Sequence, residues 1–302
     1  MRLRYRKQAA TAGVAVVALT LALGACSSSG TSAPSGGSTG TGTATAGGGG
    51  SANLSGTLNG SGSSFQLTFQ QAAIQSFKSV QSGLTVNYGG GGSGKGRTDL
   101  AAGTVNFAGS DSPIPDKEKA NFKGKTVLYF PVVIGPITLS YNLSGVSNLK
   151  LDAPVVAGLF DGKITTWNDP AIKAINSGVN LPSTPVKLAV RSDSSGTTAN
   201  FSNFLVEGAG SAWTLGTSST INWPKTAQAG NGNGGVAQIV KSTPGAIGYV
   251  DYADAKGAGL TFASVKNKAG NYIAPSTASA TTAAENATVK PDLTFKIGRA
   301  HV

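Results

Sequence analysis

Three glycine- and serine-rich loops contain the residue types best suited to bind a small anion. They span residues 59–65, 89–97 and 191–198, and each lies between a β-rich run and a helical run. Small side chains let a ligand approach the backbone, and the N–H groups in the first turn of a helix have no partner within it and favour negative charge. Helix capping alone would explain one such loop, but three together predict an anion site.

The glycine run in the second loop does not indicate a nucleotide. Gly89, Gly94 and Lys95 have the spacing of a P-loop, but Gly96 stands where that motif requires Ser or Thr to hold magnesium. A dinucleotide-binding pattern also fits Gly89, Gly91 and Gly94. Because four consecutive glycines satisfy almost any glycine spacing, this second match carries little information.

Two charged residues narrow the choice of anion. Arg191 lies four residues before Ser195 and offers a planar, multi-donor cation to an oxyanion, and Asp193 is close enough in sequence to brace that guanidinium. Asp111, at the end of a predicted strand, would repel an anion unless the ligand brings a proton to donate. Hydrogen phosphate brings one, whereas sulfate carries none at neutral pH and would leave a buried carboxylate unpaired.

The residue types needed for catalysis are scarce. His301 is the only histidine, so the chain lacks the base of a serine hydrolase and the His and carboxylate cluster of a metal-dependent phosphatase. We expect no enzyme, no cofactor and no metal, with phosphoesterase chemistry or another oxyanion, sulfate or molybdate, as the alternatives. A structural or adhesive envelope lipoprotein would explain the N-terminal lipid anchor described next, but it would not explain the pairing of Arg191 with Asp111. Nucleic acid is not an expected partner, because no basic block interleaved with aromatic residues is present.

The N-terminus predicts export and a lipid anchor. Residues 1–25 join four positive charges to an uninterrupted small and apolar run, which is typical of a signal peptide. Cys26, the only cysteine, follows "LGA" as in the lipobox of bacterial lipoproteins. Residues 26–53 are rich in Gly, Ser and Thr and predict a flexible tether. We therefore expect an exported protein that is lipid-anchored to the outer face of the cytoplasmic membrane. The formal charge of +11 suits an anion ligand but also suits plain solubility.

The remaining chain alternates β-rich and helical runs and predicts an α/β fold with two lobes. Strands are expected near residues 55–60, 84–88, 105–109, 186–191 and 246–250, with paired strands over 126–142, and helices near 65–80, 96–103, 153–160, 169–178, 198–208 and 234–242.

The chain resembles the phosphate-binding lipoproteins of bacterial high-affinity ABC phosphate importers. The likeness runs from about Leu54 to Glu285 and is carried by "VNYGGGGSG", "NFAGSDSP", "FPVVIG", "GKITTWNDPAI", "RSDSSGTT", "NGNGGVAQIV" and "PGAIGYVDYA". It implies a type II periplasmic-binding-protein fold in which phosphate bridges two hinged lobes. The permease subunits of the importer would then recognise the closed form. Residues 129–137 are our candidate for a hinge strand.

The resemblance also implies a set of phosphate contacts. These are Ser64, the backbone of Phe65, Ser93, Asp111 as proton acceptor, Arg191, Ser195, Gly196 and Thr197, with Asp193 behind Arg191. Gln66 departs from the family, which usually has a proline there that opens the helix. Lys95 and Arg97 stand where the family is commonly uncharged, and they would either enrich anions at the mouth of the site or be solvated surface charges.

The resemblance further implies that the chain is C-terminally truncated. We expect an incomplete first lobe at residues 54–134, a second lobe at 135–250 and a segment at 251–296 leading toward a return to the first lobe. Residues 297–302, "IGRAHV", read as one frame of a sequencing-library adapter, so His301 is interpreted as an artefact rather than a ligand.

Overall fold

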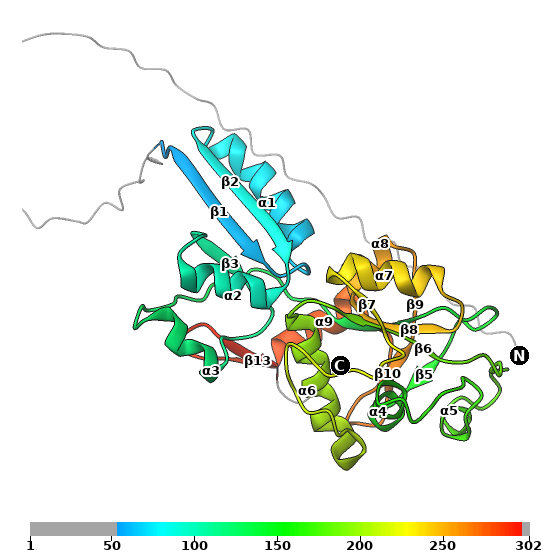
Figure 1. The fold of residues 1–302 in the computed structure, drawn as a ribbon. Helices are drawn as coiled ribbons and strands as arrows, with labels where there is room; N and C mark the ends of the chain where they lie inside the picture. Colours follow the sequence, from blue (N-terminus) through cyan, green and yellow to red (C-terminus); the bar gives the residue numbers. More distant parts are fainter. Residues whose placement is uncertain (1–52, 298–302) are drawn as a thin grey trace, which may run out of the picture. The chain divides into compact units, whose positions relative to one another are not determined.

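The computed structural model describes residues 53–297, which form an α/β arrangement with two main sheets (Figure 1). The first sheet is parallel and has the order β2-β1-β3, with strands β1 (Gly56–Gly62), β2 (Leu84–Gly91) and β3 (Phe107–Gly109). Helix α1 (Leu67–Val80) follows β1 and packs against β2, and helix α2 (Ser93–Ala102) follows β2 and packs against β1 and β3. Each of the first two anion loops therefore joins the carboxyl end of a strand to a helix.

The first sheet has little buried apolar surface. Within residues 53–121 no hydrophobic side chain is buried, and α1 contributes none. Several large side chains around this sheet are exposed instead, namely Leu54, Leu58, Phe69, Phe77 and Val80. Burial of apolar surface is the main favourable contribution to folding, so this part of the chain is weakly held.

The large sheet has five strands in the order β7-β6-β8-β4-β9. These are β4 (Ile137–Tyr141), β6 (Lys187–Arg191), β7 (Gln228–Gly230), β8 (Ala246–Asp251) and β9 (Thr261–Phe262). Strand β6 runs parallel to β7 and β8, whereas β4 is antiparallel to β8 and β9. The sheet thus places the carboxyl ends of β6, β7 and β8 at one edge.

Helices cover both faces of the large sheet. Helix α7 (Gly232–Ser242) packs on β6, β7 and β8, and α8 (Tyr252–Gly257) packs beside it, while α4 (Ala153–Phe160) packs against α6 (Gly196–Ala209). Side chains alternate between the two cores along the strands: Leu188 and Val190 join the larger core, and Ala189 joins the smaller one with Val236. Both faces of the large sheet therefore line a buried core.

Shorter elements complete the described chain. They are α3 (Asp116–Lys119), the 3₁₀ turns η1 (Ala120–Phe122) and η2 (Gly210–Ala212), α5 (Pro170–Ala174), β5 (Lys150–Leu151), β10 (Ser264–Lys266), β11 (Tyr272–Ile273), α9 (Thr277–Glu285), β12 (Ala287–Val289) and β13 (Phe295–Ile297). Strands β11, β10 and β5 form a small sheet, and β12 pairs with β13. Strand β9 joins β4, so residues that follow 250 still extend the large sheet before the chain goes on to α9.

The expected paired strands over residues 126–142 are wrong in their first part. Residues 125–136 have no regular secondary structure, and only β4 forms. The alternation of Leu128, Phe130, Val132 and Ile134 favoured a strand, but all four side chains are exposed and no neighbouring strand supplies a ladder. Backbone pairing requires a partner, which an apolar alternation does not provide by itself. The hinge role of residues 129–137 stays a prediction.

Candidate anion-binding site

Arg191 and Asp193 form a fixed ion pair at the carboxyl end of β6. Arg191 donates from Nε to Asp193 Oδ1 over 2.7 Å and from Nη2 to Asp193 Oδ2 over 2.5 Å, and both side chains are buried. Burial opposes the charged form of Asp193, but the two hydrogen bonds and the charge of Arg191 outweigh it and lower the pKa of that carboxyl. These two bonds hold the guanidinium in one orientation. Its Nη1 donates instead to Thr197 Oγ1 and Asn233 Oδ1.

Asp111 lies just after β3, and its carboxyl group accepts hydrogen bonds from two serine hydroxyl groups. Ser63 donates to Oδ1, and Ser93, the first residue of α2, donates to Oδ2 over 3.2 Å. Burial raises the pKa of Asp111, while the bonds from both serines and the charge of Arg191 act against that rise. A carboxyl group in this state is suited to share a proton with a ligand.

The start of α6 offers backbone and hydroxyl donors beside Arg191. Ser195 caps the helix, accepting from Thr198 N over 3.2 Å, and Gly196 is the first helical residue. A Cβ atom on Gly196 would lie 2.5 Å from Ser93 Oγ and 2.7 Å from Asp111 Cβ. Only glycine permits this close approach between the start of α6 and the Asp111 loop.

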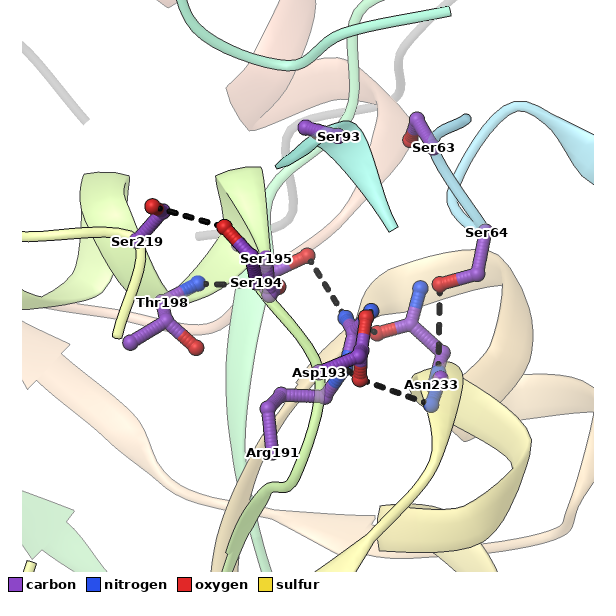
Figure 2. A network of polar contacts seen from close by, with 12 residues as sticks. Ser63, Ser64, Ser93, Arg191, Asp193, Ser194, Ser195, Thr198, Ser219 and Asn233 are labelled. Atoms are coloured by element: carbon purple, nitrogen blue, oxygen red, sulfur yellow. Dashed lines mark hydrogen bonds and ion pairs between the residues drawn. The ribbon is translucent and has the colours of Figure 1, made fainter. Parts of the chain in front are cut away.

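Asn233, at the start of α7, connects several parts of the site and was not predicted as a site residue. Its amide nitrogen Nδ2 donates to Asp251 Oδ2 over 2.6 Å and to Asp254 Oδ2 over 3.1 Å. Its Oδ1 accepts from Arg191 Nη1 over 3.4 Å, and its backbone N–H donates to Ser64 Oγ over 3.2 Å (Figure 2). The motif "NGNGG" contained Asn233, but no local pattern distinguished it from an ordinary helix-capping residue.

Direct hydrogen bonds join the segments after strands β2 and β3 of the first sheet to the segment after strand β6 of the large sheet. Gly94 N donates to Ser194 O over 2.9 Å, and Asn200 Nδ2 donates to Asp111 O over 2.8 Å. A Cβ atom on Gly92 or Gly94 would lie 2.2 Å or 2.1 Å from Asp193 Oδ2 or Ser194 Oγ. The glycine run therefore makes room for the 191–198 loop, which gives it a physical role without a nucleotide.

The structure thus brings most of the predicted residues into one network. Asp111 lies with Ser93 and beside Gly196, and Arg191 lies with Asp193 and Thr197. In the first loop Ser63, which was not predicted as a site residue, contacts Asp111, whereas Ser64 contacts Asn233. The network joins protein groups to one another, so a phosphate contact from any of the predicted residues, Ser64, Phe65, Ser93, Asp111, Arg191, Ser195, Gly196 and Thr197, stays a prediction. Cys26 and His301 lie outside the described residues.

Arg97 is not a solvated surface charge. It is only 3% exposed and forms an ion pair with Glu118, with Nε to Oε2 at 2.7 Å and Nη2 to Oε1 at 3.2 Å. It also donates to Ser110 Oγ over 3.3 Å, directly before Asp111. Lys95 is 53% exposed and pairs with Asp99 one helical turn later, in line with the surface interpretation. Arg97 points inward, so it holds α2 against the Asp111 loop.

Metal-binding and membrane-spanning features are also absent from the described part of the chain. Within residues 53–297, no three His, Cys, Asp or Glu side chains are arranged to hold a metal ion. No helix in the same range has the length and apolar character to cross a bilayer.

Comparison with known proteins agrees with this α/β arrangement. Residues 38–296 match the family model of the PBP superfamily domain. The phosphate-binding protein PstS of Pasteurella multocida is 40% identical over 235 residues, which cover 76% of this chain and 67% of that protein. Phosphate-binding protein PstS 3 of Mycobacterium leprae is 38% identical over 216 residues, 70% of this chain and 58% of the relative.

A solved structure is similar as well. The phosphate-bound, high-affinity periplasmic phosphate-binding protein PfluDING is 26% identical, with a TM-score of 0.58, over 78% of this chain and 71% of that chain. This chain therefore belongs to the PBP superfamily and, within it, to the PstS family of phosphate-binding proteins. The match confirms the resemblance and the expected fold class. The chain spans less than two thirds of the length of its mycobacterial relatives, 58% of the M. leprae protein.

Proposed function

We propose that the chain binds inorganic phosphate outside the cytoplasm and delivers it to the permease subunits of an ABC importer. The observation that carries the proposal is the pairing of a braced cation with a proton-accepting carboxyl group. Arg191 is fixed by Asp193, and Asp111, whose pKa is raised by burial, lies beside Gly196 at the start of α6. A protonated oxyanion satisfies both partners at once, because it accepts from Arg191 and donates to Asp111.

Further donors around these two residues support the same ligand. Ser63 and Ser93 point their hydroxyl groups at Asp111, and the first turn of α6 supplies backbone N–H groups. Sulfate and molybdate, the alternative oxyanions, would use Arg191 but would meet Asp111 without a proton to give it. Phosphoester hydrolysis finds less support, since the described residues contain no histidine to act as a base beside a serine.

Ligand-linked closure follows from the division of the site. Ser63, Ser93 and Asp111 follow strands of the first sheet, whereas Arg191 and the start of α6 follow β6 of the large sheet. A ligand that contacts both sets favours the conformation in which they meet, and a transporter can recognise that conformation.

The proposal includes a lipid anchor at Cys26 after removal of residues 1–25. The variant Cys26→Ala should then leave the membrane fraction of a bacterium with intact lipoprotein processing, and unchanged retention would contradict the anchor.

Isothermal titration with phosphate, sulfate and molybdate tests the ligand. The expected result is tight one-to-one binding of phosphate and binding of the other two weaker by about 10⁴ or more, because a site built around a ligand hydrogen bond discriminates that strongly. Equal affinity for phosphate and sulfate would contradict the proposal. Absence of phosphate binding by a chain that is folded by circular dichroism would also contradict it.

A further inference from the structure

Asp251 is a buried carboxyl group that the proposed ligand contacts do not use. It is the last residue of β8 and is only 4% exposed. Its Oδ2 accepts from Thr197 Oγ1 over 2.8 Å and from Asn233 Nδ2 over 2.6 Å. Asp251 directly precedes α8, but its side chain makes no capping hydrogen bond to that helix. The carboxyl group is bonded to Thr197 and Asn233 instead.

The contact with Asp251 determines what the Thr197 hydroxyl can do. A hydroxyl group has one proton and two lone pairs. Thr197 Oγ1 accepts from Arg191 Nη1 over 3.3 Å and directs its only proton to Asp251. While Asp251 is ionised, Thr197 therefore has no hydroxyl proton to offer an anion. If Asp251 is protonated, its own O–H can donate to Thr197, and the Thr197 proton becomes free for the ligand.

The charges around Asp251 favour a proton on it. Burial and the charge of Asp111 raise its pKa to about 7, while the bonds from Thr197 and Asn233 act against that rise. The charged groups near the site are Arg191 and Asp193 after β6, Asp254 on α8 and Asp111 after β3. Because Arg191 is already paired with Asp193, three further carboxyl groups would face an incoming anion if all were ionised.

We propose that Asp251 is a positioning residue that takes up a proton when the anion binds and thereby turns the Thr197 hydroxyl toward the ligand. The proton comes from solvent and forms an O–H bond on the Asp251 carboxylate, and no other covalent bond changes. This inference rests on the proposed phosphate function, but Asp251 is distinct from Asp111, which receives the ligand's own proton. As the pH rises through the titration of Asp251, anion binding weakens, because the ionised Asp251 carboxylate must first take up a proton from solvent for each anion bound.

The test measures phosphate affinity by titration calorimetry between pH 5.5 and 8.5 for the parent chain, Asp251→Asn and Asp254→Asn. Asn is neutral and does not titrate; its amide nitrogen can donate to Thr197 as a protonated carboxyl group does, but it cannot accept the hydrogen bond from Asn233. The ratio of the parent Kd to the Asp251→Asn Kd cancels the titration of phosphate itself. We expect this ratio to stay constant below pH 6 and to rise toward about tenfold per pH unit above pH 7. In buffers of different ionisation enthalpy, the parent should take up as much as one proton more per phosphate than Asp251→Asn.

Asp254→Asn is the matched control, because Asp254 also contacts Asn233 but makes no hydrogen bond to Thr197. Its negative charge raises the pKa of Asp251, so this variant should keep the pH dependence with its midpoint moved to lower pH. A flat ratio for Asp251→Asn, with phosphate bound by both proteins, would overturn the inference and leave the proposed function intact. If Asp251→Asn does not fold, because its amide nitrogen faces that of Asn233, Asp251→Ala, which cannot titrate either, takes its place in the same ratio, and a flat ratio there would overturn the inference equally. Failure of the folded parent to bind phosphate would overturn both proposals.

Discussion

Arg191 and Asp193, only two residues apart, form an ion pair with two parallel hydrogen bonds of 2.7 and 2.5 Å. The guanidinium is thus fixed by the protein before any ligand arrives. Its charge is partly balanced by Asp193, so Arg191 attracts oxyanions in general without choosing among them. Discrimination between oxyanions must then come from other residues in the site.

Arg191→Lys tests the role of the fixed cation. Lysine keeps the charge but loses the planar group and both parallel bonds to Asp193. We expect phosphate and sulfate affinities to fall together, by about 10- to 100-fold, with their ratio unchanged. Competition titrations measure both constants. A change of selectivity similar to that of an Asp111 variant would contradict this division of roles.

Asp111→Asn tests the selectivity element. The amide can donate to a fully ionised oxyanion, so the penalty against sulfate disappears together with the preference for a protonated ligand. We expect the phosphate-to-sulfate affinity ratio to fall by about 10² or more, while phosphate affinity changes less. Ser63→Ala is the control, since it removes a hydrogen bond to Asp111 but retains the carboxyl group. If Asp111→Asn still rejects sulfate as the parent does, Asp111 is not the proton acceptor.

Arg97 and Lys95 provide a matched pair for stability within one helix. Arg97→Met leaves Glu118 without its partner, and because Glu118 is 25% exposed we expect a loss of about 2 kcal/mol in the free energy of unfolding. Lys95→Met breaks an exposed pair with Asp99 and should cost less than about 0.5 kcal/mol. Urea denaturation measures both values. Equal effects would mean that the inward orientation of Arg97 does not contribute to stability.

Hydrogen exchange tests the uneven burial of the two sheets. The strands of the first sheet have no buried hydrophobic side chain, whereas β8 contributes Ile247, Tyr249 and Val250, all fully buried. We expect the amides of β1 to exchange at least about 10-fold faster than those of β8, because local opening costs less where little apolar surface is exposed by it. Mass spectrometry on proteolytic fragments resolves the two strands. Equal protection would show that the first sheet is held by contacts other than apolar burial.

The sequence allowed a good prediction of the loops because each is a local pattern. Small residues between a strand and a helix indicated the segments before α1, α2 and α6, and the α/β class followed from the alternation of runs. Asp193 could be placed beside Arg191 because only two positions separate them. Local patterns of this kind need no knowledge of distant contacts.

Long-range contacts account for what was missed. Asn233 meets Ser64, which is 169 residues away in the chain. Asp251, at the end of β8, contacts Thr197 in the first turn of α6, which is 54 residues away in the chain. Ser63, which was not among the predicted residues, donates to Asp111 across 48 positions of the chain. The inward direction of Arg97 depends on Glu118, which no periodic pattern indicates.

The lack of a buried core beneath the first sheet also bears on how long a ligand stays bound. Asp111 is carried by this weakly held part, whereas Arg191 rests on the doubly covered large sheet. We therefore expect release to begin on the Asp111 side, while the cation keeps its position for the next anion. Substitutions that cover or expose apolar surface around β1 and β2 should then alter the dissociation rate more than the association rate, even where no substituted residue contacts the ligand.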